Sequence, residues 1–166
     1  MTNTTLDESL AIVILAAGQG TRMRSSLPKV LHRIGGRPLV GHVLDTARDL
    51  APAHVLVVVR HERDQVADAV TGISPEVVVV DQDEIPGTGR AVEVALAAVP
   101  DFAGDVLVLS GDVPLLDFDT LSALIADHRQ RQILGDLVGL LGVVGGRRHR
   151  DATAVMPDHQ LQEHDL

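Results

Sequence analysis

Cysteine, tryptophan and tyrosine are all absent from this chain of 166 residues. The lack of cysteine excludes a disulfide scaffold and a thiolate metal site. Phe102 and Phe118 are the only aromatic residues, too few for the stacking platforms that bind single-stranded nucleic acid. Because the net charge is −9, the chain as a whole is not attracted to phosphate backbones. We therefore expect no nucleic-acid partner.

Long hydrophobic runs are missing as well. The apolar stretches are well short of the ~18 residues that a membrane-spanning helix needs. The polar start of the chain has no basic segment of the kind that opens a secretion signal. We therefore expect no membrane partner and a cytoplasmic location. With 45% hydrophobic and 22% charged residues, the composition is typical of one globular domain.

Four short aliphatic runs predict the strands of a buried sheet. They are residues 10–16, 55–59, 77–80 and 106–109. Continuous Val- and Ile-rich runs are typical of strands that are covered on both faces. Helical patterns follow them, at residues 38–50, 62–70, 88–99 and 117–128. This alternation predicts an α/β fold of three layers, α/β/α and Rossmann-like, with a mostly parallel sheet whose ligands bind at the carboxyl ends of the strands.

The loop after the first predicted strand combines small residues with cations. Residues 16–21 read AAGQGT, and their small side chains let a bulky anion approach the backbone closely. Arg22 and Lys29, the only lysine in the chain, supply the positive charge that phosphate binding needs. The spacing fits neither a P-loop nor the dinucleotide fingerprint, because Met23 stands at the third glycine position.

Two further loops carry candidate binding residues. Gln82 offers a side-chain amide, which reads a base edge because it has a donor and an acceptor together. Gly87 lets backbone groups reach the same base, and Thr88 is expected to cap the helix that follows. Asp112, in the sequence SGDVPL, is placed to bind Mg²⁺, which takes one or two carboxylates with water and substrate phosphates. Taken alone, each loop is also compatible with an ordinary turn.

Together these blocks resemble a known family. The segment LAAGQGTRMRSSLPKVLHRIGG, which begins at Leu15, resembles the signature of the sugar-phosphate nucleotidyltransferases. Its form PKVLHRIGGRPLVGHV is similar to the bacterial N-acetylglucosamine-1-phosphate uridylyltransferases, in which this domain is fused to a left-handed β-helix acetyltransferase. The GTG block after Gln82 and the GDVPL block around Asp112 resemble the uracil-binding and metal motifs of that family. Arg90 departs from it, since the family usually has His there.

The resemblance implies transfer of a uridylyl group from UTP to N-acetylglucosamine 1-phosphate, with Mg²⁺ as cofactor and pyrophosphate as the second product. It implies that Arg22 and Lys29 are the catalytic cations and that Asp112 is the metal ligand. The nucleotide-binding residues that it implies are Leu15, Ala16, Ala17, Gly18, Gly20, Thr21, Lys29, Gln82, Gly87, Thr88, Ser110, Gly111 and Asp112.

The recognisable motifs end near residue 130. We expect residues 1–9 to be disordered, residues 10–130 to form the nucleotidyltransferase domain, and residues 131–166 to be a divergent tail that is solvated or disordered. Residues 133–146 are apolar but interrupted by glycine, and they fit neither a helix nor a strand cleanly. The sugar- and metal-binding strands of the family are missing here, which predicts a fold that is incomplete at the C-terminus: a truncated or frame-shifted product, or a short paralogue.

Two alternatives to uridylyl transfer stay open. The guanylyltransferases of molybdenum-cofactor synthesis and the cytidylyltransferases of isoprenoid synthesis share the architecture of the first loop, but they usually lack the PKVLH and GTG blocks. The other alternative is a chain that binds a nucleotide without turnover, because the acceptor side of the family's site is not recognisable.

Overall fold

A parallel sheet forms the centre of the molecule. The computed structural model describes residues 6–18, 23 and 25–141, with side chains to residue 132. Its strands are β1 (Asp7–Leu15), β4 (Pro52–Val59), β5 (Val78–Asp81) and β6 (Asp105–Ser110). They pair in the order β5-β4-β1-β6, and every pair is parallel. The four predicted strands and their parallel arrangement are confirmed.

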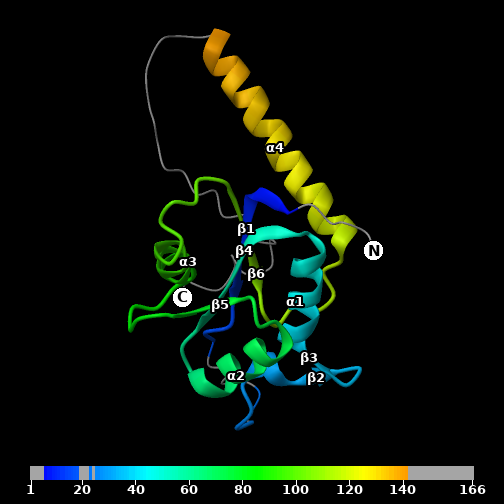
Figure 1. Ribbon diagram of the computed structural model, residues 1–166, viewed down its shortest axis with the longest axis vertical. Helices are drawn as coiled ribbons and strands as arrows, with labels where there is room; N and C mark the ends of the chain where they lie inside the picture. The colour runs from blue at the N-terminus through cyan, green and yellow to red at the C-terminus, as the bar shows by residue number, and fades with distance from the viewer. Residues whose placement is uncertain (1–5, 19–22, 24, 142–166) are drawn as a thin grey trace, which may run out of the picture.

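Helices cover both faces of this sheet (Figure 1). They are α1 (Leu39–Asp49), α2 (Arg63–Ile73), α3 (Thr88–Ala97) and α4 (Phe118–Leu141). Buried side chains of α1, α2 and α4 pack in one core cluster, whereas those of α3 pack in a second cluster. The three-layer α/β/α fold is therefore confirmed.

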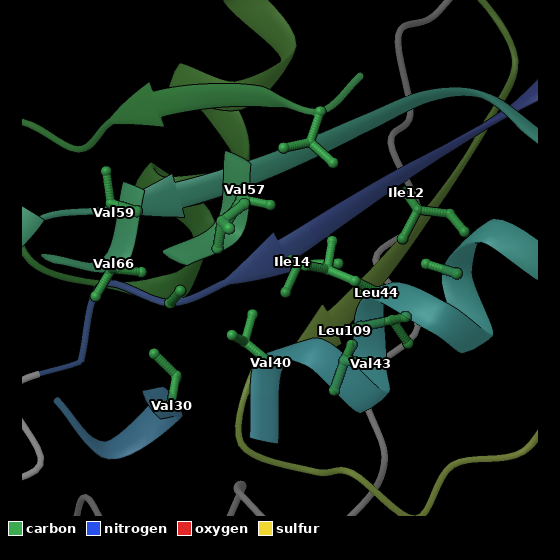
Figure 2. Close-up of a cluster of buried hydrophobic side chains, with 14 of the residues drawn as sticks. Ile12, Ile14, Val30, Val40, Val43, Leu44, Val57, Val59, Val66 and Leu109 are labelled. Atoms are coloured by element: carbon green, nitrogen blue, oxygen red, sulfur yellow. The ribbon is translucent and has the colours of Figure 1, made fainter. Parts of the chain in front are cut away.

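The side chains of β1 show how the two clusters are divided. Ile12 and Ile14 lie in the cluster with α1 and α2, which Figure 2 shows, while Ala11 and Val13 lie in the cluster with α3. Successive side chains of a strand point to opposite faces of the sheet. All four are fully buried, which explains why the strand reads as a continuous apolar run.

Two short elements were not predicted. A single 3-10 turn, η2 (Lys29–Leu31), precedes an antiparallel hairpin of β2 (Arg33–Ile34) and β3 (Arg37–Pro38). Gly35 and Gly36 form the turn of this hairpin, with φ values of 58° and 82°, a conformation that glycine adopts at no steric cost. Elements of two or three residues leave no periodic pattern in a sequence, so they could not be predicted from one.

The helix starts differ from the predictions at two positions. Pro38 was expected in the first turn of α1, but it is the cap residue before Leu39. Thr88 was expected to cap α3, but Gly87 occupies the cap position with a φ of 121° and Thr88 is the first helical residue. At α4 the Asp117 carboxylate accepts a hydrogen bond from the Thr120 N–H at 2.7 Å, so Asp117 is the cap there.

The expected disorder near the N-terminus is wrong for residues 7–9. The Asp7 N–H donates to the Ala51 carbonyl at 2.6 Å, and this pairing extends β1 to Asp7. The expectation that residues 133–146 form no helix is wrong as far as Leu141, where α4 ends. Each glycine costs a helix only about 1 kcal/mol, which the good helix formers around it offset. The remaining residues of the expected tail lie outside the described ones.

The carboxyl half of α4 extends away from the sheet (Figure 1). Among the residues that the structure describes, no helix is long and apolar enough to cross a membrane.

Arg129 links α4 to the amino ends of β1 and β6 through polar contacts. Its guanidinium donates to Asp105 Oδ2 at 2.6 Å and to Ser9 Oγ at 3.0 Å, and it lies 2.9 Å from Asp7 Oδ2. Hydrogen bonds from Ser9 and Arg129 hold the pKa of Asp7 below its ordinary value. The ionised Asp7 carboxylate therefore stabilises the fold above about pH 4, and this contribution is lost as the pH falls through the pKa of Asp7 in the folded chain.

We expect Arg129→Met to lower the free energy of unfolding by about 1–3 kcal/mol at pH 7, because the largely buried Asp105 carboxylate loses its arginine partner. At pH 3 the difference from the wild-type chain should shrink. Chemical denaturation at both pH values measures it. Arg131→Met is the matched control: among the side chains that the structure describes, Arg131 pairs only with the exposed Asp127 on the same helix, a contact worth about 0.5 kcal/mol or less. An equal loss in the two variants would contradict this role of Arg129.

Candidate active site

The candidate site begins with an ion pair between two predicted site residues. The Lys29 ammonium contacts the Asp112 carboxylate, and the other carboxylate oxygen accepts a hydrogen bond from the Ser110 hydroxyl at 2.5 Å. Lys29 comes from η2 and Asp112 follows β6, so the fold joins two segments that are far apart in the sequence. The proposed phosphate-binding cation and the proposed metal ligand therefore occupy one place.

Packing of the main chain explains why these segments meet. Val30, next to Lys29, is buried in the core. The Gly111 N–H donates to the Leu15 carbonyl at 2.9 Å, so the carboxyl ends of β1 and β6 lie against each other. A Cβ at Gly111 would come within 3.0 Å of the Leu15 oxygen and 3.3 Å of Val30 Cγ1. Glycine at this position lets the three segments approach closely.

The Asp112 carboxylate stays ionised in this setting. Burial raises the pKa of Asp112. Hydrogen bonds from Lys29 and Ser110, together with the charge of Lys29, lower this pKa by more than burial raises it, so the net shift is downward. The Asp112 side chain is only 15% exposed, whereas that of Lys29 is 45% exposed. An incoming phosphate can therefore reach the ammonium from solvent.

Asp112 could contribute a carboxylate to a divalent-metal site that a phosphorylated ligand completes. Among the described residues there is no group of three His, Asp or Glu side chains that could hold a metal. Asp112 offers one ionised carboxylate, and Mg²⁺ characteristically takes one or two carboxylates and completes its octahedron with water and substrate phosphates. The described donor set therefore suits a metal whose binding becomes tighter when a nucleotide supplies further ligands.

The second predicted loop, residues 82–88, lies after β5 at the same carboxyl edge of the sheet. The Gln82 side chain donates from Nε2 to two backbone carbonyls of this loop, those of Ile85 and Gly87, each at 3.1 Å. Both partners are acceptors, so the amide nitrogen must face them, and its donor capacity is engaged within the loop. The Gln82 side chain was expected to read a base with both its amide donor and its amide acceptor. Because the donor is engaged in the loop, only the Oε1 acceptor is left for a base.

The structure brings some of the predicted residues together and leaves others apart. Those at the touching ends of β1, η2 and β6 are Leu15, Ala16, Lys29, Ser110, Gly111 and Asp112. Ala17 and Gly18 follow β1, and Gln82, Gly87 and Thr88 belong to the loop after β5, which is separated from β1 by β4. Gly20, Thr21 and Arg22 lie outside the described residues, so their roles stay predictions.

The sequence did not reveal the residues that hold the 82–88 loop. The Asp83 carboxylate accepts hydrogen bonds from the Arg90 guanidinium. Arg60 donates from Nη2 to the Glu84 carbonyl at 3.0 Å. The only available signal was Arg90 itself, because an arginine stands where the resembled family usually has histidine.

Comparison with known families agrees with this geometry. The family described as the MobA-like NTP transferase domain matches residues 12–160. The chain belongs to this family. The match runs past residue 130, where the recognisable motifs end, so the membership covers most of the chain.

Curated relatives place this MobA-like domain among longer proteins. It is 67% identical to the bifunctional protein GlmU of Clavibacter sepedonicus over 123 residues, which cover 74% of this chain and 25% of that protein. It is 49% identical to GlmU of Kineococcus radiotolerans over 160 residues, which cover 87% of this chain and 33% of that protein. The resemblance drawn from the motifs is confirmed, and the chain spans about a quarter to a third of the length of these relatives.

A solved structure shares the fold. Rv0371c from Mycobacterium tuberculosis H37Rv superposes with a TM-score of 0.59 at 28% identity, covering 74% of this chain and 61% of that one. Its complex with manganese superposes with a TM-score of 0.58 at 25% identity, covering 71% and 58%. A divalent metal is thus present in one structure to which this domain is similar.

Proposed function

We propose that this MobA-like domain binds UTP with Mg²⁺ and transfers the uridylyl group to N-acetylglucosamine 1-phosphate. The observation that carries the proposal is the ion pair of Lys29 and Asp112 at the touching ends of β1 and β6. It places a solvent-accessible cation and an ionised carboxylate where ligands bind in parallel sheets. The resemblance of the loop motifs to the uridylyltransferases, and the identity to proteins named GlmU, support the choice of substrates.

The base loop supports UTP rather than CTP. The Gln82 Oε1 acceptor, which has no hydrogen-bond partner among the described residues, can receive the N3–H of uracil. The corresponding ring nitrogen of cytosine is itself an acceptor, so it would face the Gln82 oxygen without a hydrogen between them. An unpaired polar contact of this kind costs about 1–3 kcal/mol when it is buried. Guanine also carries a ring N–H, and this contact alone does not discriminate against it.

The reaction requires positioning and charge neutralisation more than proton transfer. A phosphate oxygen of the sugar phosphate attacks the α-phosphorus of UTP in line, a new P–O bond forms, and the bond to the bridging oxygen of the leaving pyrophosphate breaks. The nucleophile is already an anion, so no general base is needed. Lys29 stabilises the negative charge of the phosphates. When bound on Asp112, Mg²⁺ would supply further neutralisation of phosphate charge.

Calorimetry of the purified chain with UTP, CTP and GTP, each with Mg²⁺, tests the nucleotide assignment. We expect UTP to bind at least about 10-fold more tightly than CTP, as the Gln82 contact requires. Tighter binding of CTP or GTP would favour a cytidylyl- or guanylyltransferase instead.

A pyrophosphate-release assay with N-acetylglucosamine 1-phosphate tests the second candidate, binding without turnover. That candidate is favoured by one observation: Asp112 is the sole carboxylate at the described part of the phosphate site, and no cluster of three metal-binding side chains is found among the described residues. Binding of UTP with no release of pyrophosphate would favour this candidate. Release above about 1 s⁻¹, an ordinary enzyme rate, would contradict it.

A further inference from the structure

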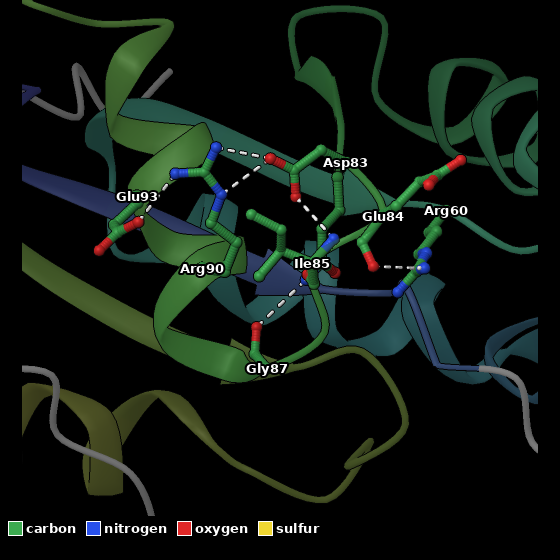
Figure 3. Close-up of polar contacts among 8 residues, drawn as sticks. Arg60, Asp83, Glu84, Ile85, Gly87, Arg90 and Glu93 are labelled. Atoms are coloured by element: carbon green, nitrogen blue, oxygen red, sulfur yellow. Dashed lines mark hydrogen bonds and ion pairs between the residues drawn. The ribbon is translucent and has the colours of Figure 1, made fainter.

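Asp83 joins the backbone of the 82–88 loop to helix α3 (Figure 3). One of its carboxylate oxygens, Oδ1, accepts a hydrogen bond from the Ile85 N–H at 3.1 Å. The other, Oδ2, accepts two from the Arg90 guanidinium, from Nε at 2.9 Å and from Nη2 at 2.5 Å. The direction of the Asp83 side chain is therefore fixed from both sides, by the loop and by the helix.

Ile85 carries this constraint on to Gln82. Its N–H is held by Asp83, and its carbonyl accepts a hydrogen bond from Gln82 Nε2 at 3.1 Å. The same Gln82 nitrogen also donates to the Gly87 carbonyl. The Ile85 N–H shares its peptide unit with the Glu84 carbonyl, which accepts a hydrogen bond from Arg60, the residue just after β4. This peptide unit is therefore held on both sides, and a change in its orientation would displace the adjoining Ile85 carbonyl and the Gln82 amide that is bonded to it.

An arginine at position 90 is electrostatically unfavourable unless something compensates it. Arg90 is the third residue of α3, and the amino end of a helix carries partial positive charge, which repels a cation. Two carboxylates offset this: Asp83 in the loop, and Glu93, whose Oε2 lies 3.0 Å from Arg90 Nη1. The Arg90 guanidinium in turn holds the pKa of Asp83 below its ordinary value, so the pair stays charged across the neutral range.

We propose that Asp83 and Arg90 are positioning residues for base recognition: their ion pair fixes the Glu84–Ile85 peptide unit and, through the adjoining Ile85 carbonyl, the direction in which Gln82 presents its amide oxygen. This role rests on the proposed function of the loop. Neither residue needs to touch the nucleotide, since each acts through Gln82.

The test compares Asp83→Asn and Arg90→Gln with the wild-type chain. Calorimetry with UTP, CTP and inorganic tripolyphosphate, each with Mg²⁺, measures base and phosphate binding separately. We expect each variant to bind UTP about 10-fold more weakly, with CTP and tripolyphosphate nearly unchanged, so that the preference for UTP over CTP falls. Arg90→Lys, which keeps the charge but contacts a single point, should recover part of the lost preference.

Glu93→Gln is the matched control, because it removes the other partner of Arg90 and leaves the Asp83 contact in place. Its preference for UTP should match that of the wild-type chain. Unchanged UTP affinity in both Asp83→Asn and Arg90→Gln would overturn the proposal. An equal loss for UTP, CTP and tripolyphosphate, together with a lower melting temperature, would also overturn it, since that pattern reports a structural role only.

Amide hydrogen exchange at Ile85 separates this proposal from the proposed function. Exchange should be faster in both variants than in the wild-type chain without any ligand, because the Asp83 bond to this N–H is lost or loosened. If the wild-type chain binds no UTP, the proposed function is overturned, and accelerated exchange still supports the constraint on the loop. Unaltered exchange at Ile85 would overturn the constraint even if UTP binds.

Discussion

Gly104→Ala is expected to destabilise the chain by about 3 kcal/mol, the size of effect that overpacking against main chain produces. Gly104 lies just before β6, and an added Cβ would come within 2.6 Å of the Ser9 carbonyl carbon, closer still to the Ser9 oxygen, and within 2.7 Å of Phe102 Cζ. Ser9 belongs to β1, so its backbone cannot move without disturbing the first pairings of β1 with β6. For a chain of this size the loss corresponds to a melting temperature roughly 6–12 °C lower.

Gly72→Ala provides the control for this substitution. Gly72 lies in α2, and a Cβ there would meet no atom within 4 Å. Alanine is the better helix former by about 1 kcal/mol, so this variant should be as stable as the wild-type chain or more stable. Thermal unfolding followed by circular dichroism compares the three proteins. Equal stability of the two variants would contradict the close approach at Gly104.

The strands of this fold could be predicted because a strand that is buried on both faces has a continuous run of apolar residues, which is visible in the sequence. The runs around Ile12, Val57 and Val108 are apolar at every position, and each became a strand within a few residues of its predicted bounds. The close packing of a glycine against neighbouring main chain produces no such pattern in the sequence. Nothing in the sequence distinguishes Gly104, which is packed against main chain, from Gly72, which has open space around it.

The same contrast holds for the site. The small residues after β1 and the Asp after β6 could be predicted, because parallel sheets bind ligands at these strand ends. The contact between Lys29 and Asp112 could not, because it depends on how η2 packs its buried Val30 beside Gly111. The hydrogen bonds of Gln82 could not be predicted either, and they reverse part of the expectation, since its amide donors are already used within the loop.

Lys29→Met and Asp112→Asn should change metal binding in opposite directions. Without a nucleotide, the Lys29 ammonium occupies the Asp112 carboxylate, so a divalent cation must displace it to bind there. We expect Lys29→Met to bind Mn²⁺ several-fold more tightly than the wild-type chain when no nucleotide is present. Asp112→Asn should show no specific Mn²⁺ binding at this site, because the charge that holds the metal is gone. Electron paramagnetic resonance of free Mn²⁺ in a titration measures both.

With UTP the two variants should both fail, for different reasons. Lys29→Met loses a charge-assisted phosphate contact worth about 1.5–3 kcal/mol, which weakens UTP binding roughly 10- to 150-fold. Asp112→Asn should abolish the dependence of UTP binding on Mg²⁺ while its unfolding stays close to that of the wild-type chain. Arg33→Met is the control, because Arg33 follows Lys29 closely in the sequence but its guanidinium donates to the Gly36 carbonyl at 3.1 Å. If Lys29→Met instead lowers Mn²⁺ affinity in the absence of nucleotide, Lys29 does not compete for Asp112, and the ion pair is only a structural contact.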